Sequence, residues 1–184
     1  MENEGTQSIQ RIGFGRRLGA YLLDGLTVGI LGSVIGPFAG AGLGELILGS
    51  QLSAIPGMED LGMGAVLGGM FGFVGGTIIL GFLNMLLEGV IGQTIGKMIL
   101  GIKVGNQDGS TADIGKMMGR ACLKSINGIC TLLAALVGVD AIATIGSIGG
   151  LVIFVGCFLV LGGSKLSIHD MVTKTAIYRK GEMV

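Results

Sequence analysis

The chain has 184 residues, of which 50% are hydrophobic and only 13% are charged, and its formal net charge at pH 7 is zero. A soluble domain usually carries about 25% charged residues, so this composition indicates an integral membrane protein whose main partner is the lipid bilayer. The zero net charge gives no support to nucleic-acid binding. Glycine occurs 38 times, which favours close packing of helices in lipid.

Four apolar segments are long enough to cross a hydrocarbon core, which needs about 20 residues. We expect helices over about 18–37, 61–87, 117–139 and 142–162, with Pro37 ending the first. They predict an all-α integral membrane protein: one domain over residues 1–184, a glycine-rich bundle of four transmembrane helices. The sequence leaves open whether the short apolar stretch Ala39–Gly49 enters the membrane.

The lysines and arginines are unevenly distributed along the chain. All 12 lie before the first predicted helix, after the fourth, or between the second and the body of the third. Because cytoplasmic loops carry the excess of basic residues, this pattern places both termini in the cytoplasm, in a multi-pass protein of the cell membrane.

Glycine recurs at every fourth position of the second predicted helix, at Gly64, Gly68, Gly72 and Gly76. This spacing keeps one face free of side chains and resembles a GxxxG contact. We interpret it first as packing between helices of one chain. The alternative is a homodimer through these glycine-rich faces.

The segment between the second and third predicted helices is less apolar. Ile102, Lys103 and Val104 alternate, and Asp108-Gly109 is a strong turn signal. We therefore expect a small cytoplasmic β-hairpin or turn–strand element here. The nearby Gly-rich stretch lacks the Ser or Thr of a phosphate loop, since Met98 follows Lys97.

Two charged residues in the first apolar segment are the main site candidates. Arg17 and Asp24 are seven residues apart and share one face of a helix. A charge at the centre of a membrane helix costs about 2.5–3.5 kcal/mol, so a carboxylate there needs a reason. The residues leave three interpretations open: a static Arg17–Asp24 pair, a carboxylate that exchanges a proton for another cation, and a lipid-facing Asp24.

A second candidate, Asp170, lies near the C-terminal end of the sequence. Ser167 could cap a short helix over Ile168–Thr173. Asp170 would then be a capping or helix-dipole carboxylate, or a partner for Arg17. Secondary candidates are Glu88, Asn84 and His169.

Three sequence blocks carry a resemblance to a known family. They begin at Phe14, Gly92 and Leu166 and read FGRRLGAYLLDGL, GQTIGKMILGIKVGNQDGS and LSIHDMVTKTAIY. In this order they resemble the RDD family of prokaryotic membrane proteins, which is named for one arginine and two aspartates. The residues that match are Arg17, Asp24 and Asp170. Cation/proton antiport has been proposed for some members.

Two functions follow as hypotheses. In the first, the chain is a small secondary transporter that exchanges monovalent cations for protons through Asp24, assisted by Arg17 or Asp170. In the alternative, it is a non-transporting membrane scaffold or accessory protein in which Arg17, Asp24 and Asp170 form an ion-paired lock, and its basic surface binds anionic lipid or a partner. The sequence has one histidine and no spacing typical of metal ligands, so we expect no enzyme, metal or cofactor.

Overall fold

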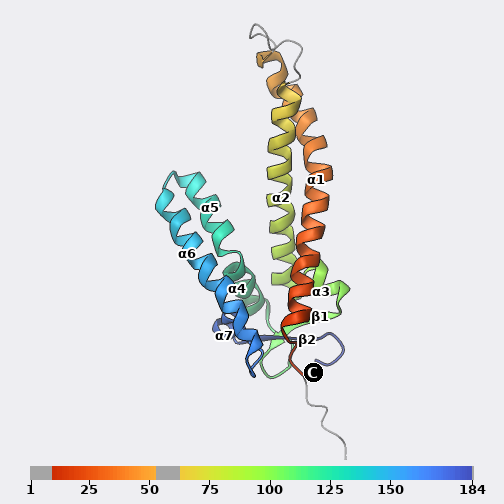
Figure 1. Cartoon of the computed structure of the whole chain (residues 1–184), viewed down its shortest axis with the longest axis vertical. Coiled ribbons are helices and arrows are strands. Elements are labelled where there is room, and N and C mark those ends of the chain that lie inside the picture. The colour runs from red at the N-terminus through yellow and green to blue at the C-terminus, as the bar shows by residue number, and fades with distance from the viewer. Residues whose placement is uncertain (1–9, 53–62, 184) are drawn as a thin grey trace, which may run out of the picture. The chain divides into compact units, whose positions relative to one another are not determined.

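The computed structural model describes residues 10–52 and 63–183. Its elements, shown in Figure 1, are the helices α1 (Phe14–Leu52), α2 (Met63–Ile91), α3 (Ile95–Ile99), α4 (Ile114–Lys124), α5 (Ile126–Val137), α6 (Asp140–Gly156) and α7 (Ile168–Thr173), the 3-10 helix η1 (Cys157–Leu161), and the strands β1 (Ile102–Asn106) and β2 (Thr175–Arg179). They form two compact units. We call Leu23–Asn84 the two-helix unit and the described parts of 1–22 and 85–184 the sheet unit.

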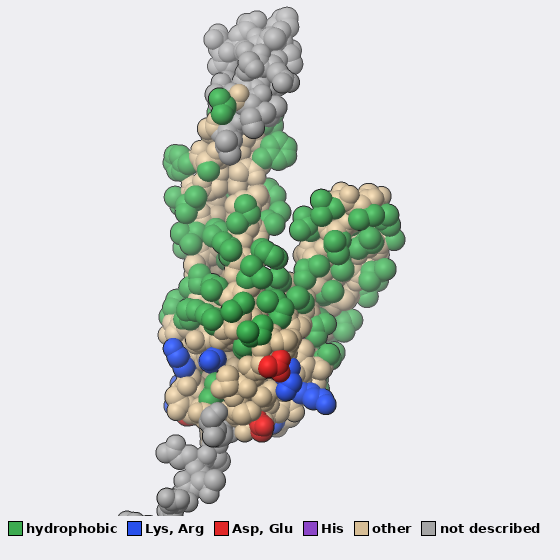
Figure 2. All heavy atoms as spheres, turned by 180° about the vertical axis from the view of Figure 1, so that it is seen from behind, with side chains coloured by type: hydrophobic (Ala, Val, Ile, Leu, Met, Phe, Trp, Pro, Cys, Tyr) green, Lys and Arg blue, Asp and Glu red, His purple; other side chains and the backbone are tan. Residues whose placement is uncertain are grey.

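The long helices are apolar enough to cross a membrane. Candidate spans are Phe14–Gly42, Gly64–Ile91 and Asp140–Leu161, and α4 with α5 makes a fourth if that bent pair is counted as one span. Figure 2 shows hydrophobic side chains over the helices, while charged side chains gather around the end of the sheet unit that carries the strands. By length and composition, the described residues therefore contain three or four candidate spans.

The predicted end of the first helix at Pro37 is wrong. α1 continues through Pro37 to Leu52, so Ala39–Gly49 is part of the same helix. Proline removes one backbone donor, but a chain that leaves the helix inside lipid would expose several unpaired backbone groups. A helix that continues through Pro37 therefore leaves fewer backbone groups unpaired than one that ends there. The second and fourth predicted helices correspond to α2 and to α6 with η1, and the predicted positions 61 and 62 lie outside the described residues.

The third predicted helix is not continuous. α4 and α5 meet at Ser125 and are bent by 73°. α4 has buried Arg120 and Met117 on its inner face, whereas α5 is apolar and largely exposed. The break separates a segment bound to protein from a segment suited to lipid.

Glycines allow α1 and α2 to pack closely within the two-helix unit. A Cβ atom added to Gly72 would meet the backbone of Gly36 and Gly40, and one added to Gly40 would meet the backbone of Gly68. Figure 1 shows the two helices side by side along this stretch. The expected packing between helices of one chain is confirmed at these positions, and the homodimer stays a prediction.

The fold is not purely α-helical, because it also contains a two-stranded sheet. β1 pairs antiparallel with β2, with Val104 opposite Ile177. The expected turn forms, with Gly109 at φ 90°, but the chain after it makes only one isolated bridge, between Gly105 and Thr111. β2 supplies three buried apolar side chains, Ala176, Ile177 and Tyr178, whereas the segment just after the turn supplies only the small side chain of Ala112. Burying the larger apolar area favours the long-range pairing.

Candidate functional site: a buried ion-pair network

Arg17 connects the start of α1 to the segment around α7. Its Nε donates to the carbonyl oxygen of Ile12 at 3.0 Å and its Nη2 to that of Lys165 at 2.8 Å. Its Nη1 donates to a carboxylate oxygen of Asp170. The guanidinium thus uses all three of its nitrogens within the sheet unit.

Asp170 is completely buried and serves two roles. Ser167 begins α7 with a capping box, and the Ser167 N–H donates to Oδ2 of Asp170 at 3.1 Å. Arg120 donates through Nε to Oδ1 at 2.9 Å. Burial alone would raise the pKa of Asp170, but Arg120 and Arg17 outweigh burial and hold that pKa well below its usual range. The two interpretations of Asp170, a capping carboxylate and a partner of Arg17, both hold.

Glu88, one turn before the end of α2, forms ion pairs with three cationic side chains. Lys97 from α3 donates to Oε1 at 2.5 Å, and Lys124 from α4 donates to Oε2 at 2.6 Å. Arg120 also donates to Oε1. Only 2% of Glu88 is exposed, so this carboxylate is surrounded by positive charge rather than water.

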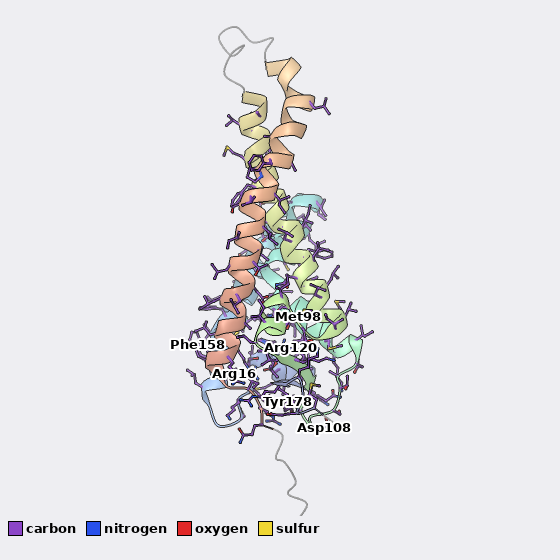
Figure 3. The ribbon with its side chains drawn as sticks, turned by 90° about the vertical axis from the view of Figure 1, so that its right-hand side faces the viewer. Arg16, Met98, Asp108, Arg120, Phe158 and Tyr178 are labelled. Carbon is purple, nitrogen blue, oxygen red and sulfur yellow. The ribbon has the colours of Figure 1, made fainter. Side chains whose placement is uncertain are left out.

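Arg120 joins the two carboxylates into one structure. It is 2% exposed, and it contacts Asp170 through Nε and Glu88 through Nη1. Figure 3 labels Arg120 among the side chains of the sheet unit. We call the connected set the ion-pair network; its members are Arg17, Glu88, Lys97, Arg120, Lys124 and Asp170.

His169 packs against this network as a neutral ring. Its Nε2 lies 3.2 Å from Nη2 of Arg120 and 2.9 Å from Oγ of Ser167. Because a guanidinium only donates, Nε2 accepts and the proton sits on Nδ1. Burial, reinforced by Arg120, lowers the pKa of His169 to about 3. The ring therefore stays neutral at physiological pH.

The other predicted residues lie elsewhere. Asp24 and Asn84 belong to the two-helix unit, where both are partly buried. Sequence reasoning did not select Lys97, Arg120 or Lys124 as site residues. Two basic residues at the start of an otherwise apolar segment were the available signal for Arg120 and Lys124, since such charges need partners in a membrane protein.

The network has a definite chemical character. Each carboxylate is bound by at least two cations, so neither has the open oxygen that a monovalent cation would need. Within residues 10–52 and 63–183, no three His, Cys, Asp or Glu side chains are grouped so that they could hold a metal ion. What the geometry provides is a buried connection between α1, α2, α3, α4 and α7.

The sequence matches the family model of the RDD family over residues 11–174. This range contains Arg17, Asp24 and Asp170, and it also contains all other members of the network. Comparisons with curated proteins and with solved structures give no match.

Proposed function

The chain belongs to the RDD family of membrane proteins, and from this premise we propose that it acts as a non-transporting membrane scaffold or accessory protein whose helix ends are locked by the ion-pair network. The observation that carries the proposal is that cations bind both carboxylates of the network. Asp170 is bound by Arg17 and Arg120, and Glu88 is bound by Lys97, Arg120 and Lys124. A partner would then meet a rigid surface rather than a moving gate.

Electrostatics supports this choice. Three cations surround Glu88 within hydrogen-bonding distance, so a Na⁺ or K⁺ approaching that carboxylate would meet more repulsion than attraction. Proton exchange at Asp170 is equally disfavoured near neutral pH, because two guanidinium groups keep its pKa low. The network is suited to holding positions, not to passing cations.

The proposal includes an orientation. The distribution of the 12 basic residues supports a cell-membrane protein with both termini in the cytoplasm. The network would then lie at the cytoplasmic ends of the spans, because Arg17 is near the start of α1 and Glu88 is near the end of α2.

Cation/proton exchange through Asp24 is the second candidate. Asp24 is a partly buried carboxylate inside the candidate span Phe14–Gly42. Ionisable residues at such positions often belong to ion or proton pathways. In this function the network would be the fixed part of the protein, and Asp24 would carry the exchanged proton.

One reconstitution experiment separates the two candidates. Purified protein in liposomes loaded with a pH-sensitive dye receives Na⁺, K⁺ or Li⁺ outside, and the internal pH is recorded. The variants are Asp24→Asn and, as a matched control at the exposed start of another candidate span, Asp140→Asn. The scaffold proposal expects no cation-dependent pH change above that of empty liposomes. Proton movement that is lost in folded Asp24→Asn and kept in Asp140→Asn would overturn it and establish exchange.

A further inference from the structure

The ion-pair network carries more positive than negative charge. Its cationic members are Arg17, Lys97, Arg120 and Lys124, and its anionic members are Glu88 and Asp170. The neutral ring of His169 adds no negative charge. Buried charges without counter-charges are costly, so a site with this imbalance favours an additional anion.

The excess positive charge is concentrated at Lys97 and Lys124, the two lysines that bind Glu88. An ammonium group has three N–H donors, yet Lys97 and Lys124 each donate one bond, in both cases to Glu88. Their remaining donors have no protein acceptor among the described residues. Lys97 is only 4% exposed, so its unpaired donors are costly where they are.

The two lysines differ in exposure in a way that provides access. The Lys124 side chain is 26% exposed, whereas that of Lys97 is 6% exposed. Lys97 binds Oε1 and Lys124 binds Oε2 of the same carboxylate, so Glu88 brings an ammonium group from α3 and one from α4 to a single site. An anion would therefore meet Lys124 first from solvent, and Lys97 is the buried cation on the other oxygen of Glu88.

We propose that Lys97 and Lys124 form a binding site for a phosphate-type anion, held beside Glu88 by charge-assisted hydrogen bonds. A tetrahedral phosphate group offers several acceptor oxygens, which matches the unpaired donors of the two ammonium groups on Glu88. Burial lowers the pKa of Lys97, and Glu88 offsets this only in part. An anion beside Lys97 would raise that pKa again, because it favours the charged ammonium.

Two sources share this chemistry, the headgroup of an anionic phospholipid and free phosphate. Glu88 is three residues before the end of α2 at Ile91, which is about 4.5 Å along a helix. Headgroup phosphates lie at this level, just outside the hydrocarbon core. Basic pockets between membrane helices bind such headgroups.

This inference deepens the proposed scaffold role and rests on it, because a bound lipid headgroup would add the anion that the ion-pair network lacks. The binding itself is measured without any flux, so its failure is distinguishable from failure of the proposed function.

The test measures thermal stability in a neutral detergent. Cys122, Cys130 and Cys157 are free and partly buried, so a thiol-reactive fluorogenic dye reports unfolding. The probes are sodium phosphate against sodium chloride at equal ionic strength, and short-chain phosphatidylglycerol against phosphatidylcholine with the same chains. Each probe is titrated to obtain an apparent Kd.

The variants are Lys124→Gln and a control on the same helix, Lys116→Gln, whose side chain is 41% exposed and lies outside the network. We expect Lys124→Gln to weaken binding of the effective probe on the order of tenfold, which is the value of one charge-assisted hydrogen bond. Lys116→Gln should change it less than about twofold. Lys97→Gln provides a second test at the buried position.

Every outcome decides between the sources or overturns the site. Stabilisation by phosphatidylglycerol alone assigns a lipid headgroup, stabilisation by phosphate alone assigns the free anion, and stabilisation by both assigns a site open to either. No stabilisation by either probe, or equal stabilisation in wild type, Lys124→Gln and Lys97→Gln, overturns the proposal.

Discussion

Replacing Asp170 by asparagine should destabilise the chain strongly, because the network has too few carboxylates. The two side chains have nearly the same shape, so the change mainly removes one negative charge. Arg120 keeps its contact with Glu88. Asparagine keeps one acceptor oxygen and has an NH2 donor in place of the other, so Arg17 and Arg120 can no longer each donate to an oxygen of their own at residue 170. The excess of positive charge in the network rises from two to three.

The expected cost follows from burial. Asp170 is 0% exposed and Arg120 is 2% exposed, so water cannot screen the charges that the substitution leaves behind. Removing one partner of a buried ion pair typically costs about 3–5 kcal/mol. For a chain of this size that corresponds to a fall in Tm on the order of 10 °C.

The matched control is Asp113→Asn. Asp113 caps the N-terminus of α4 by accepting from the Lys116 N–H at 3.0 Å, and its side chain is 62% exposed. Asparagine caps helices as well as aspartate does, so this substitution should cost less than about 1 kcal/mol. Both variants and the wild type are compared in detergent by dye labelling of the three cysteines during heating.

A small difference between the two variants would refute the reasoning. If folded Asp170→Asn melts within about 2 °C of Asp113→Asn, equivalent to roughly 1 kcal/mol or less, the buried charges are compensated by something other than Asp170. Arg17→Gln in the Asp170→Asn background checks the mechanism further. That double variant should recover part of the lost stability, since it removes the cation left without a carboxylate.

Three further predictions use the same assay. The pKa of His169 in the folded chain, about 3, lies below its ordinary value of about 6.5, so as pH falls the unfolded chain binds this proton first. The free energy of unfolding is therefore not reduced by this group above about pH 6.5, and below that pH it falls by about 1.4 kcal/mol per pH unit. His169→Gln removes the only histidine and should abolish this slope between pH 6.5 and 5.5. An unchanged slope would contradict the assignment of the slope to His169. Gly72→Val should lower Tm by several degrees because its Cβ meets the backbone of Gly36 and Gly40, whereas Gly75→Ala, with open space around the added Cβ, should not; equal effects would argue against the close packing. Pro37→Ala should raise Tm, since it restores a helix donor in the interior of α1, and a fall in Tm would indicate that the proline ring itself is needed.

Composition and periodicity predict the membrane helices well, because long apolar segments have few other structures available to them. The boundaries were harder. Pro37 is a common helix terminator in soluble proteins, but α1 continues through it. Hydropathy does not predict the bend at Ser125, which follows a helix whose buried Arg120 bonds to Asp170 and Glu88, both distant in the sequence.

Three members of the candidate site can be predicted from the sequence: Arg17, Asp170 and, as a secondary candidate, Glu88. Arg17 and Asp170 stand out because they lie in two of the three blocks that resemble the RDD family, and the structure pairs them across 153 positions of sequence. Glu88 is a secondary candidate because it is a third carboxylate, at the end of the second predicted helix. Lys97 is not distinguished by anything local from the basic residues that flank membrane helices in general. Arg120 and Lys124 have one local signal, their place at the start of an otherwise apolar segment, but that signal does not identify their distant partners.

The position of the network explains why its charges are tolerated. Arg17 lies near the start of α1, Glu88 near the end of α2, and Lys124 at the end of α4. A charge near the end of a span costs less than one at its centre, and here each is also bound by an opposite charge. Asp24 lies further along α1 in the other unit. Substitutions in the network should therefore change stability and anion binding, while any cation flux should depend on Asp24, and these two sets of measurements test the two functions independently.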